Sequence, residues 1–184
     1  MQEHRENHTV TVAGLTRSLP LSEVVPGVRI AILNILGDTE FVQACAQALV
    51  NRLDPSAYDV LVTAEAKSIP LIYAMAVLTG KPWVVLRKSQ KLYMGDSISA
   101  ETVSITSGRS QTLYLDEKDR DLIRGSRVCL VDDVISTGST QRAMRSVIDK
   151  AEGKVTLESA IFTEGDPEPW KHVISLGHLP VFTS

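Results

Sequence analysis

The feature that most limits the possible folds is residues 128–140, which read VCLVDDVISTGST. Four apolar residues predict a buried strand, and two acidic residues follow them directly. Small hydroxyl residues and one glycine come next, and an amphipathic helical pattern begins at Ser139. Parallel α/β sheets are built from strands that turn in this way into helices, and they bind ligands at the carboxyl ends of their strands.

Each part of this run has a chemical use. Backbone N–H groups at a helix N-terminus, together with the helix dipole, favour an anion such as phosphate. Gly138 lets the backbone approach a ligand closely. Asp132 and Asp133 repel phosphate, but they can accept hydrogen bonds from sugar hydroxyls or hold a divalent ion through water. Further hydroxyl donors are Ser136, Thr137, Ser139 and Thr140. The run therefore suits a sugar phosphate better than the alternative, a plain helix cap.

Strand and helix patterns alternate through the rest of the chain. Helices are expected from Asp38 or Thr39, near Pro70 and from Ser139, and residues 9–21 predict a hairpin. The expected strands are residues 28–36, 58–63, 83–86, 111–115, 127–131 and 155–162. We predict an α/β fold with a mainly parallel central sheet flanked by helices. The chain would be one domain over residues 1–184, with a core at about 26–163. The N-terminal hairpin (about 9–25) and an irregular tail (about 164–184), with a last short strand near Val181, would form a small hood.

The composition excludes several classes of function. The chain has 19 Lys and Arg against 22 Asp and Glu, a balance that argues against sequence-independent binding of nucleic acid. No apolar run is long enough to cross a membrane, and the first residues have no apolar signal core. Cys45 and Cys129 lie in apolar patterns and read as buried thiols. We expect a soluble cytoplasmic protein with no nucleic-acid or membrane partner.

The run at 128–140 resembles the signature of the type I phosphoribosyltransferases, which bind 5-phosphoribosyl-1-pyrophosphate (PRPP). The resemblance covers about residues 26–163 and is nearest to the adenine phosphoribosyltransferase-like group. Residues 63–68, TAEAKS, look like the family's pyrophosphate loop. Residues 87–91, RKSQK, carry three cations that suit a pyrophosphate. The polar segment that follows, at about 88–110, matches in position the flexible loop that closes over PRPP.

This resemblance implies the type I phosphoribosyltransferase fold, a homodimer and transfer of ribose 5-phosphate from PRPP to a purine, with adenine preferred. Asp132 and Asp133 would bind the ribose hydroxyls. No residue is assigned as a direct metal ligand, because PRPP carries the Mg²⁺ and the two acids can hold it through water. The 5-phosphate loop and its border with the base would comprise Val134, Ile135, Ser136, Thr137, Gly138, Ser139 and Thr140. The pyrophosphate residues would be Glu65, Ala66, Lys67, Arg87, Lys88 and Lys91.

Two positions depart from the family pattern. Adenine enzymes carry a Glu in the loop that closes over PRPP, where this chain has Thr106. Hypoxanthine-guanine enzymes carry an Asp in the PRPP loop, where this chain has Ser136. Glu101 is the nearby substitute for the missing proton carrier. The alternatives are therefore a non-catalytic regulatory protein that senses PRPP or a nucleotide, or a hypoxanthine-, xanthine- or orotate-type phosphoribosyltransferase.

Overall fold

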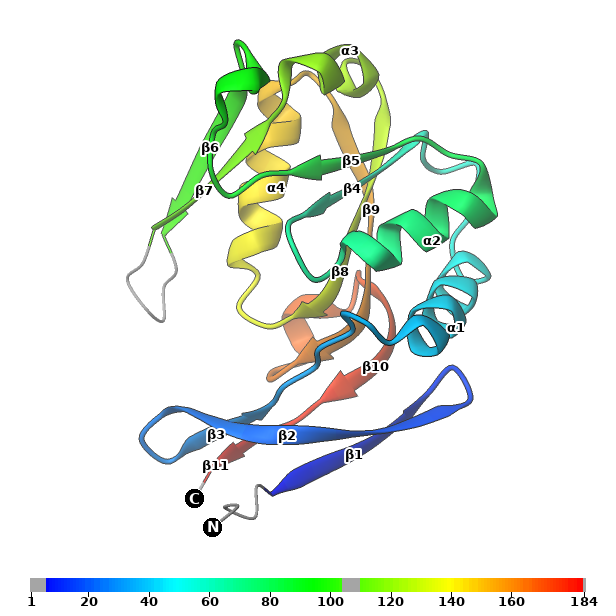
Figure 1. Cartoon of the computed structure of the whole chain (residues 1–184), viewed down its shortest axis with the longest axis vertical. Coiled ribbons are helices and arrows are strands. Elements are labelled where there is room, and N and C mark those ends of the chain that lie inside the picture. Colours follow the sequence, from blue (N-terminus) through cyan, green and yellow to red (C-terminus); the bar gives the residue numbers. More distant parts are fainter. Residues whose placement is uncertain (1–5, 104–109, 184) are drawn as a thin grey trace.

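A five-stranded parallel sheet forms the centre of the molecule. The computed structural model describes residues 6–103 and 110–183 (Figure 1). The strand order is β10-β9-β8-β4-β5, and all neighbouring strands are parallel. The bounds are β4 Val60–Ala64, β5 Trp83–Leu86, β8 Arg127–Ile135, β9 Lys154–Glu164 and β10 Ile174–Leu179. The predicted α/β architecture is confirmed.

Helices cover both faces of this sheet because successive residues of its strands are apolar and point to opposite faces. On β8, Cys129 and Val131 pack with α1 (Thr39–Val50) and α2 (Ile69–Thr79). Val128 and Leu130 point the other way and pack with α4 (Ser139–Lys150). A strand that is buried on both faces is typical of parallel sheets. On the α4 side lie the short helix α3 (Arg120–Ile123) and an antiparallel hairpin of β6 (Ile98–Val103) and β7 (Ser110–Leu115).

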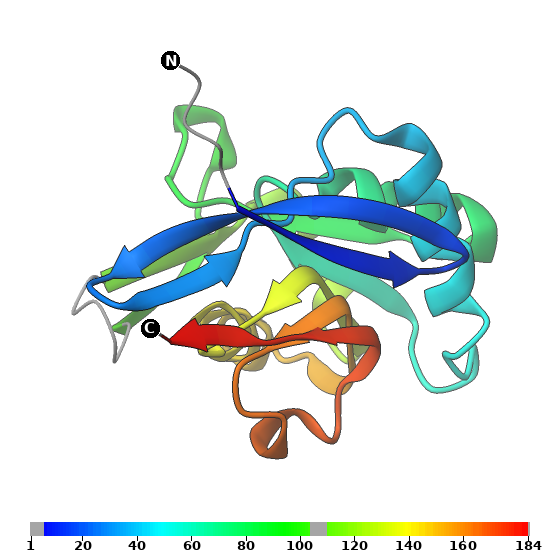
Figure 2. The same ribbon diagram turned by 90° about the horizontal axis from the view of Figure 1, so that it is seen from below.

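A second, antiparallel sheet forms the predicted hood. Its order is β1-β2-β3-β11, with β1 Asn7–Val12, β2 Leu15–Val25, β3 Val28–Ala31 and β11 Val181–Thr183. Figures 1 and 2 show it beyond the ends of β8 and β9. Its apolar residues share one core cluster with Phe162 of β9 and Leu179 of β10. The hood therefore closes the side of the central sheet where parallel α/β proteins bind ligands.

One ion pair ties the hood to the first helix. Arg17 on β2 donates from Nε to Asp38 Oδ2 at 2.7 Å, and its guanidinium also lies over the ring of Phe41. The other oxygen of Asp38 accepts from Phe41 N at 3.1 Å, which identifies Asp38 as the N-cap of α1. The hydrogen bond from Arg17 lowers the pKa of the Asp38 carboxyl. The cap therefore stays ionised, and a negative charge is favourable at a helix N-terminus.

Three segments differ from the sequence-based expectations. The strand expected at 28–36 ends at Ala31. Strand β8 continues beyond Val131 to Ile135, because it pairs with β9 as far as Thr163. The tail was predicted to be irregular, and this was wrong for β10, which reads ISLGHL and pairs with β9 in parallel. A glycine and a histidine interrupt its apolar pattern, so the pairing partner and not the local sequence makes it a strand.

The segment at about 88–110 has regular structure in its described part. The polar segment expected to form a lid contains β6, which runs beside β7 along α4 (Figure 1). Thr106 lies outside the described residues. Within residues 6–103 and 110–183, no helix is long and apolar enough to span a membrane.

Candidate active site

The two acids of the sequence motif occupy successive positions near the end of β8. Since neighbouring side chains of a strand point to opposite faces, they have different partners. Asp132 faces α4, where Gln141 Nε2 donates to its Oδ2 at 2.7 Å. Asp133 faces the start of α2, and its Oδ2 lies 2.9 Å from Lys67 Nζ. The carboxylates thus connect β8 to the segments that follow β4 and precede α4.

Ser68 joins the two carboxylates. Its hydroxyl lies 2.9 Å from Asp132 Oδ1 and 3.2 Å from Asp133 Oδ1, and it accepts from Asp133 N at 3.0 Å. A hydroxyl has one proton, so it can donate to only one of the two acids at a time. The other acid keeps an oxygen that can accept a hydrogen bond from a ligand.

The surroundings of Asp132 favour its protonated form. Burial, the negative charge of Asp133 and a hydrogen bond with Asp133 raise the pKa of Asp132 from 3.8 to about 7. The hydroxyl of Ser68 and the N–H of Asp133 oppose this rise but do not cancel it. Two adjacent carboxylates with a single nearby lysine leave negative charge uncompensated. A cation or a set of hydroxyl donors would relieve this repulsion.

The loop after β8 is a glycine turn that leads directly into α4. Ser136 and Thr137 are exposed, and Gly138 has φ 72°, a left-handed conformation that favours glycine. The carbonyl of Thr137 accepts from Arg142 Nη1 at 3.0 Å, which ties the loop to the first turn of α4. Helix α4 begins directly after this loop, with Ser139 and Thr140 as its first residues, and the N-terminal end of a helix favours an anion through its dipole and its N–H groups.

The predicted pyrophosphate residues come from the ends of β4 and β5. Besides Asp133, Lys67 Nζ contacts the carbonyl oxygen of Leu33 at 3.1 Å. Glu65 accepts from Lys88 N at 2.6 Å, and its other oxygen lies 2.7 Å from Arg87 Nε. The Glu65–Ala66 peptide bond is cis. Lys67 therefore bridges β8 and the segment after β3, while Arg87 and Lys88 are held against Glu65.

The four remaining predicted site residues lie in different surroundings from the acids of β8. Lys91 is exposed just before the 3-10 turn Leu92–Met94. Glu101 is exposed on β6, one residue after the buried Ala100, so it points to the opposite face of the hairpin. Val134 is half-buried, whereas Ile135 is buried with Ala160 and Val173. In this structure Ile135 supports the loop from inside the protein.

Sequence reasoning missed Ser68 and Gln141 as partners of the acids. Both are almost fully buried, at 2% and 4% exposure, and a buried polar side chain needs a partner. Ser68 stands directly before a helix with a proline in its first turn, so its local pattern reads as an ordinary N-cap. Its hydroxyl does not cap α2 and bonds to the acids instead. Only the packing of β4 beside β8 reveals this role.

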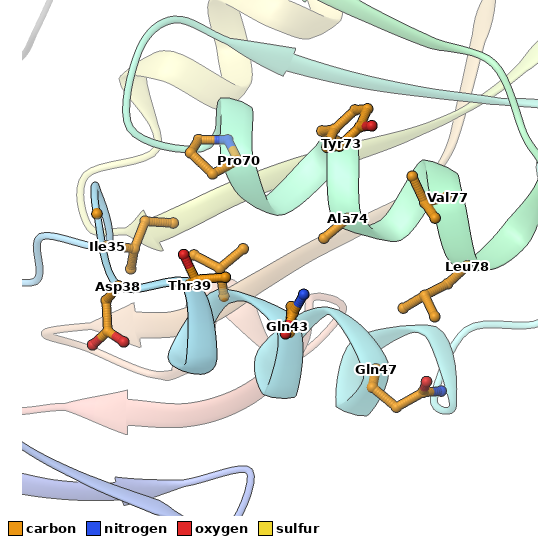
Figure 3. Close-up of a pocket in the computed structure, with 12 residues that line it drawn as sticks. Ile35, Asp38, Thr39, Gln43, Gln47, Pro70, Tyr73, Ala74, Val77 and Leu78 are labelled. Atoms are coloured by element: carbon orange, nitrogen blue, oxygen red, sulfur yellow. The ribbon is translucent and has the colours of Figure 1, made fainter.

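A cavity elsewhere in the molecule holds none of the predicted site residues. It has a volume of about 440 Å³ and lies between α1 and α2 (Figure 3). Its lining combines apolar residues of α2, such as Tyr73 and Val77, with Gln43 and Gln47 of α1. The acids of β8 and the loop after them lie outside it, so the cavity is not part of the candidate active site.

The chemistry of the donors fits Mg²⁺ only as an ion shared with a ligand. Within residues 6–103 and 110–183, no cluster of three or more His, Cys, Asp or Glu side chains could hold a metal ion. Mg²⁺ commonly takes one or two carboxylates and completes its shell with waters and substrate phosphates. Asp132 and Asp133 could supply that small share.

Comparison with known proteins gives a consistent result. The phosphoribosyl transferase domain family matches residues 32–175, a range that contains every predicted site residue. Hypoxanthine/guanine phosphoribosyltransferase of Methanosphaerula palustris is 31% identical over 162 residues, which are 88% of this chain and 80% of that protein. The purine biosynthesis transcriptional repressor PurR of Bacillus subtilis is 28% identical over 155 residues, or 84% of this chain. The chain spans only 53% of the length of that repressor.

A solved structure shares the fold. Adenine phosphoribosyltransferase from Thermoanaerobacter pseudethanolicus superposes with a TM-score of 0.66 at 19% identity. The alignment covers 94% of this chain and 95% of that one. Identity at this level supports a shared architecture and no more. The type I fold inferred from the sequence is confirmed by this likeness and by the family match.

The raised pKa of Asp132 predicts a pH-dependent stability. The unfolded carboxyl ionises near pH 3.8 and the folded one near pH 7, so folding takes up a proton between these values. The stabilisation that comes from protonated Asp132 is therefore fully present below about pH 3.8. It is lost as the pH rises through about 7, the pKa of Asp132 in the folded chain. We expect Asp132→Asn to gain stability relative to the wild type by about 1 kcal/mol or more between about pH 5 and pH 8. Denaturant unfolding at several pH values measures this difference.

Asp59→Asn is the matched control. Hydrogen bonds from Arg127 lower the pKa of Asp59, so this carboxyl is ionised in both folded and unfolded chains across that pH range. Its effect on stability should not change between about pH 5 and pH 8. A pH-independent difference for Asp132→Asn as well would contradict the raised pKa.

Proposed function

The chain belongs to the phosphoribosyl transferase domain family, and from this premise we propose that it is a cytoplasmic purine phosphoribosyltransferase. It transfers the ribose 5-phosphate of PRPP to a purine, giving a nucleoside monophosphate and pyrophosphate. Adenine is the first candidate base and hypoxanthine the second. The observation that carries the proposal is the joint presence of two acids near the end of β8 and, directly after them, a glycine turn that leads into the start of α4, an arrangement that could bind a phosphate.

Each group has a task in this reaction. The loop 136–140 binds the 5-phosphate through backbone N–H groups and hydroxyls. Asp132 and Asp133 accept hydrogen bonds from the ribose hydroxyls and favour the positive charge that develops on the sugar as its bond to pyrophosphate breaks. Lys67, already 2.9 Å from Asp133, stabilises the charge that builds up on the leaving pyrophosphate.

Mg²⁺ enters this proposal as a companion of PRPP. Bound to the pyrophosphate, it would neutralise negative charge on the leaving group. Asp132 and Asp133 would hold it through water, and Lys67 would supply a further positive charge beside them. The pKa of Asp132 is raised by burial and then by the charge of Asp133, and a cation near the two acids would relieve the repulsion between them.

Two observations favour a second candidate, a protein that binds PRPP or a nucleotide without catalysis. One relative is the transcriptional repressor PurR of Bacillus subtilis. The chain also carries Thr106 and Ser136 where the two kinds of purine enzyme carry an acid. A family member that lacks both acids needs another proton carrier, for which Glu101 is our candidate, or it binds its ligand without turnover.

One assay separates these candidates. The protein is incubated with PRPP, Mg²⁺ and one base at a time, namely adenine, hypoxanthine, guanine, xanthine, uracil and orotate, and pyrophosphate release is measured. We expect turnover with a single purine, adenine before hypoxanthine. Tight PRPP binding without turnover on any base would support the regulatory candidate. Absence of both binding and turnover would reject the proposed function altogether.

Asp133→Asn tests the role of the acids. The variant keeps the size of the side chain but removes the charge that accepts hydrogen bonds from the ribose. Because a hydrogen bond to a charged group contributes about 1.5–3 kcal/mol, PRPP affinity should fall about tenfold or more. Isothermal titration calorimetry measures the affinity, and the melting temperature checks the fold. Asp59→Asn at the other end of the sheet should bind PRPP like the wild type, and equal affinity of Asp133→Asn would refute the assignment.

We also propose that the protein is a homodimer and that α2 contributes to the interface. This helix is apolar all around, and its outer face exposes Tyr73, Val77 and Leu78 at 56%, 65% and 46%. A helix with no polar face normally has both sides covered. We expect light scattering to report twice the mass of the chain, and Val77→Lys to shift it toward the monomer. A wild-type monomer, or an unchanged dimer in the variant, would remove α2 from the interface.

A further inference from the structure

Trp170 packs against the glycine of the phosphate-binding loop. A Cβ atom added to Gly138 would lie 2.2 Å from Trp170 Cη2, so the edge of the indole occupies the space where any other residue would place its side chain. Gly138 also needs its left-handed φ of 72°. The loop therefore depends on glycine for two reasons, its own backbone conformation and the contact with an aromatic ring that lies 32 residues further along the chain.

The segment that carries Trp170 is anchored by a buried carboxylate. His172 Nε2 lies 2.8 Å from Glu158 Oε2, and the other oxygen of Glu158 lies 2.6 Å from Arg145 Nε on α4. The side chain of Glu158 is 2% exposed. A buried charge is tolerated where its partners compensate it, so this cluster fixes the position of the segment relative to α4.

The same segment supports the residue before the loop. Ile135, Ala160 and Val173 form a small buried cluster, and Trp170 packs against it. The indole thus contacts the loop through Gly138 and lies beside the cluster that holds the end of β8. Loops in contact with a phosphate must keep several N–H groups in one arrangement, and a rigid ring behind the loop limits the alternatives.

From these contacts we propose that Trp170 is a positioning residue for the phosphate-binding loop, and that the cluster of Arg145, Glu158 and His172 holds it in place. This inference rests on the proposed function, because it takes the loop 136–140 to bind the 5-phosphate of the sugar. The contacts of Trp170 described above are with Gly138 and with the cluster behind the end of β8, whereas the pyrophosphate residues Lys67, Arg87 and Lys88 follow β4 and β5. Loss of Trp170 should therefore weaken binding of the ribose 5-phosphate end of PRPP selectively.

Two partial ligands test this selectivity. Ribose 5-phosphate and pyrophosphate are each titrated into the full chain, with Mg²⁺ present, and their affinities are measured by calorimetry. Trp170→Leu should weaken ribose 5-phosphate binding by about tenfold, because a loop without its supporting ring no longer holds its N–H groups in one arrangement. Pyrophosphate affinity should stay unchanged. Trp170→Phe keeps an aromatic ring but lacks the distal indole atoms that approach Gly138, so it should restore only part of the loss. Trp83→Leu, the same change at the other tryptophan, should alter neither affinity.

Fluorescence keeps the inference testable if Trp170→Leu fails to fold. In Trp83→Phe the only remaining tryptophan is Trp170, because the chain contains two. Ribose 5-phosphate should shift its emission, since the ligand would bind on the other side of Gly138, and pyrophosphate should shift it much less.

The outcomes separate this inference from the proposed function. If the wild type binds ribose 5-phosphate but its affinity is insensitive to Trp170→Leu, or if both ligands weaken equally, the positioning role is wrong and the proposed function stands. If Trp170→Leu is unfolded, and if ribose 5-phosphate does not change the emission of Trp170 in the Trp83→Phe variant, the positioning role is likewise rejected. If the wild type binds neither ligand, both ideas fall.

Discussion

The structure of the site depends on how two successive carboxylates are compensated at the end of one strand. A β-strand sends Asp132 and Asp133 to opposite faces, so no single neighbour can satisfy both. Gln141 at the start of α4 donates to Asp132, and Lys67 before α2 forms an ion pair with Asp133. The hydroxyl of Ser68 lies between the two carboxylates. These contacts fix two helix starts relative to β8. Burial, and after it the charge of Asp133, raise the pKa of Asp132 to about 7, and a cation or hydroxyl donors beside the two acids would relieve the repulsion between them.

The sequence predicted the parts of this arrangement that are local in the chain. The strand, the paired acids, the glycine turn and the helix after them follow one another in 13 residues, and their order alone predicts a ligand site at the end of a parallel strand. Apolar runs likewise predicted β4 and β5, and the helix starts expected at Asp38 or Thr39 and at Ser139 agree with α1 and α4. In these segments local preference and tertiary packing agree, which is why single-sequence reasoning worked.

The parts that could not be predicted are those that depend on distant segments. Strand β10 has a weak pattern of its own and becomes a strand only by pairing with β9. Ser68 reads as a helix cap, yet it bonds to acids more than 60 residues away in the chain. Trp170 reads as an ordinary packing residue, and its contact with Gly138 appears only once the tail has folded back. Tertiary contacts of this kind leave no periodic signal.

The central claim is that the end of β8 and the loop after it bind a phosphorylated pentose. The most direct measurement is a crystal structure of the protein with PRPP and Mg²⁺. It should show the 5-phosphate on the backbone N–H groups of residues 136–140, with the ribose hydroxyls within hydrogen-bond distance of Asp132 and Asp133. Ligand density at any other location, or a loop that remains empty at saturating PRPP, would contradict the account.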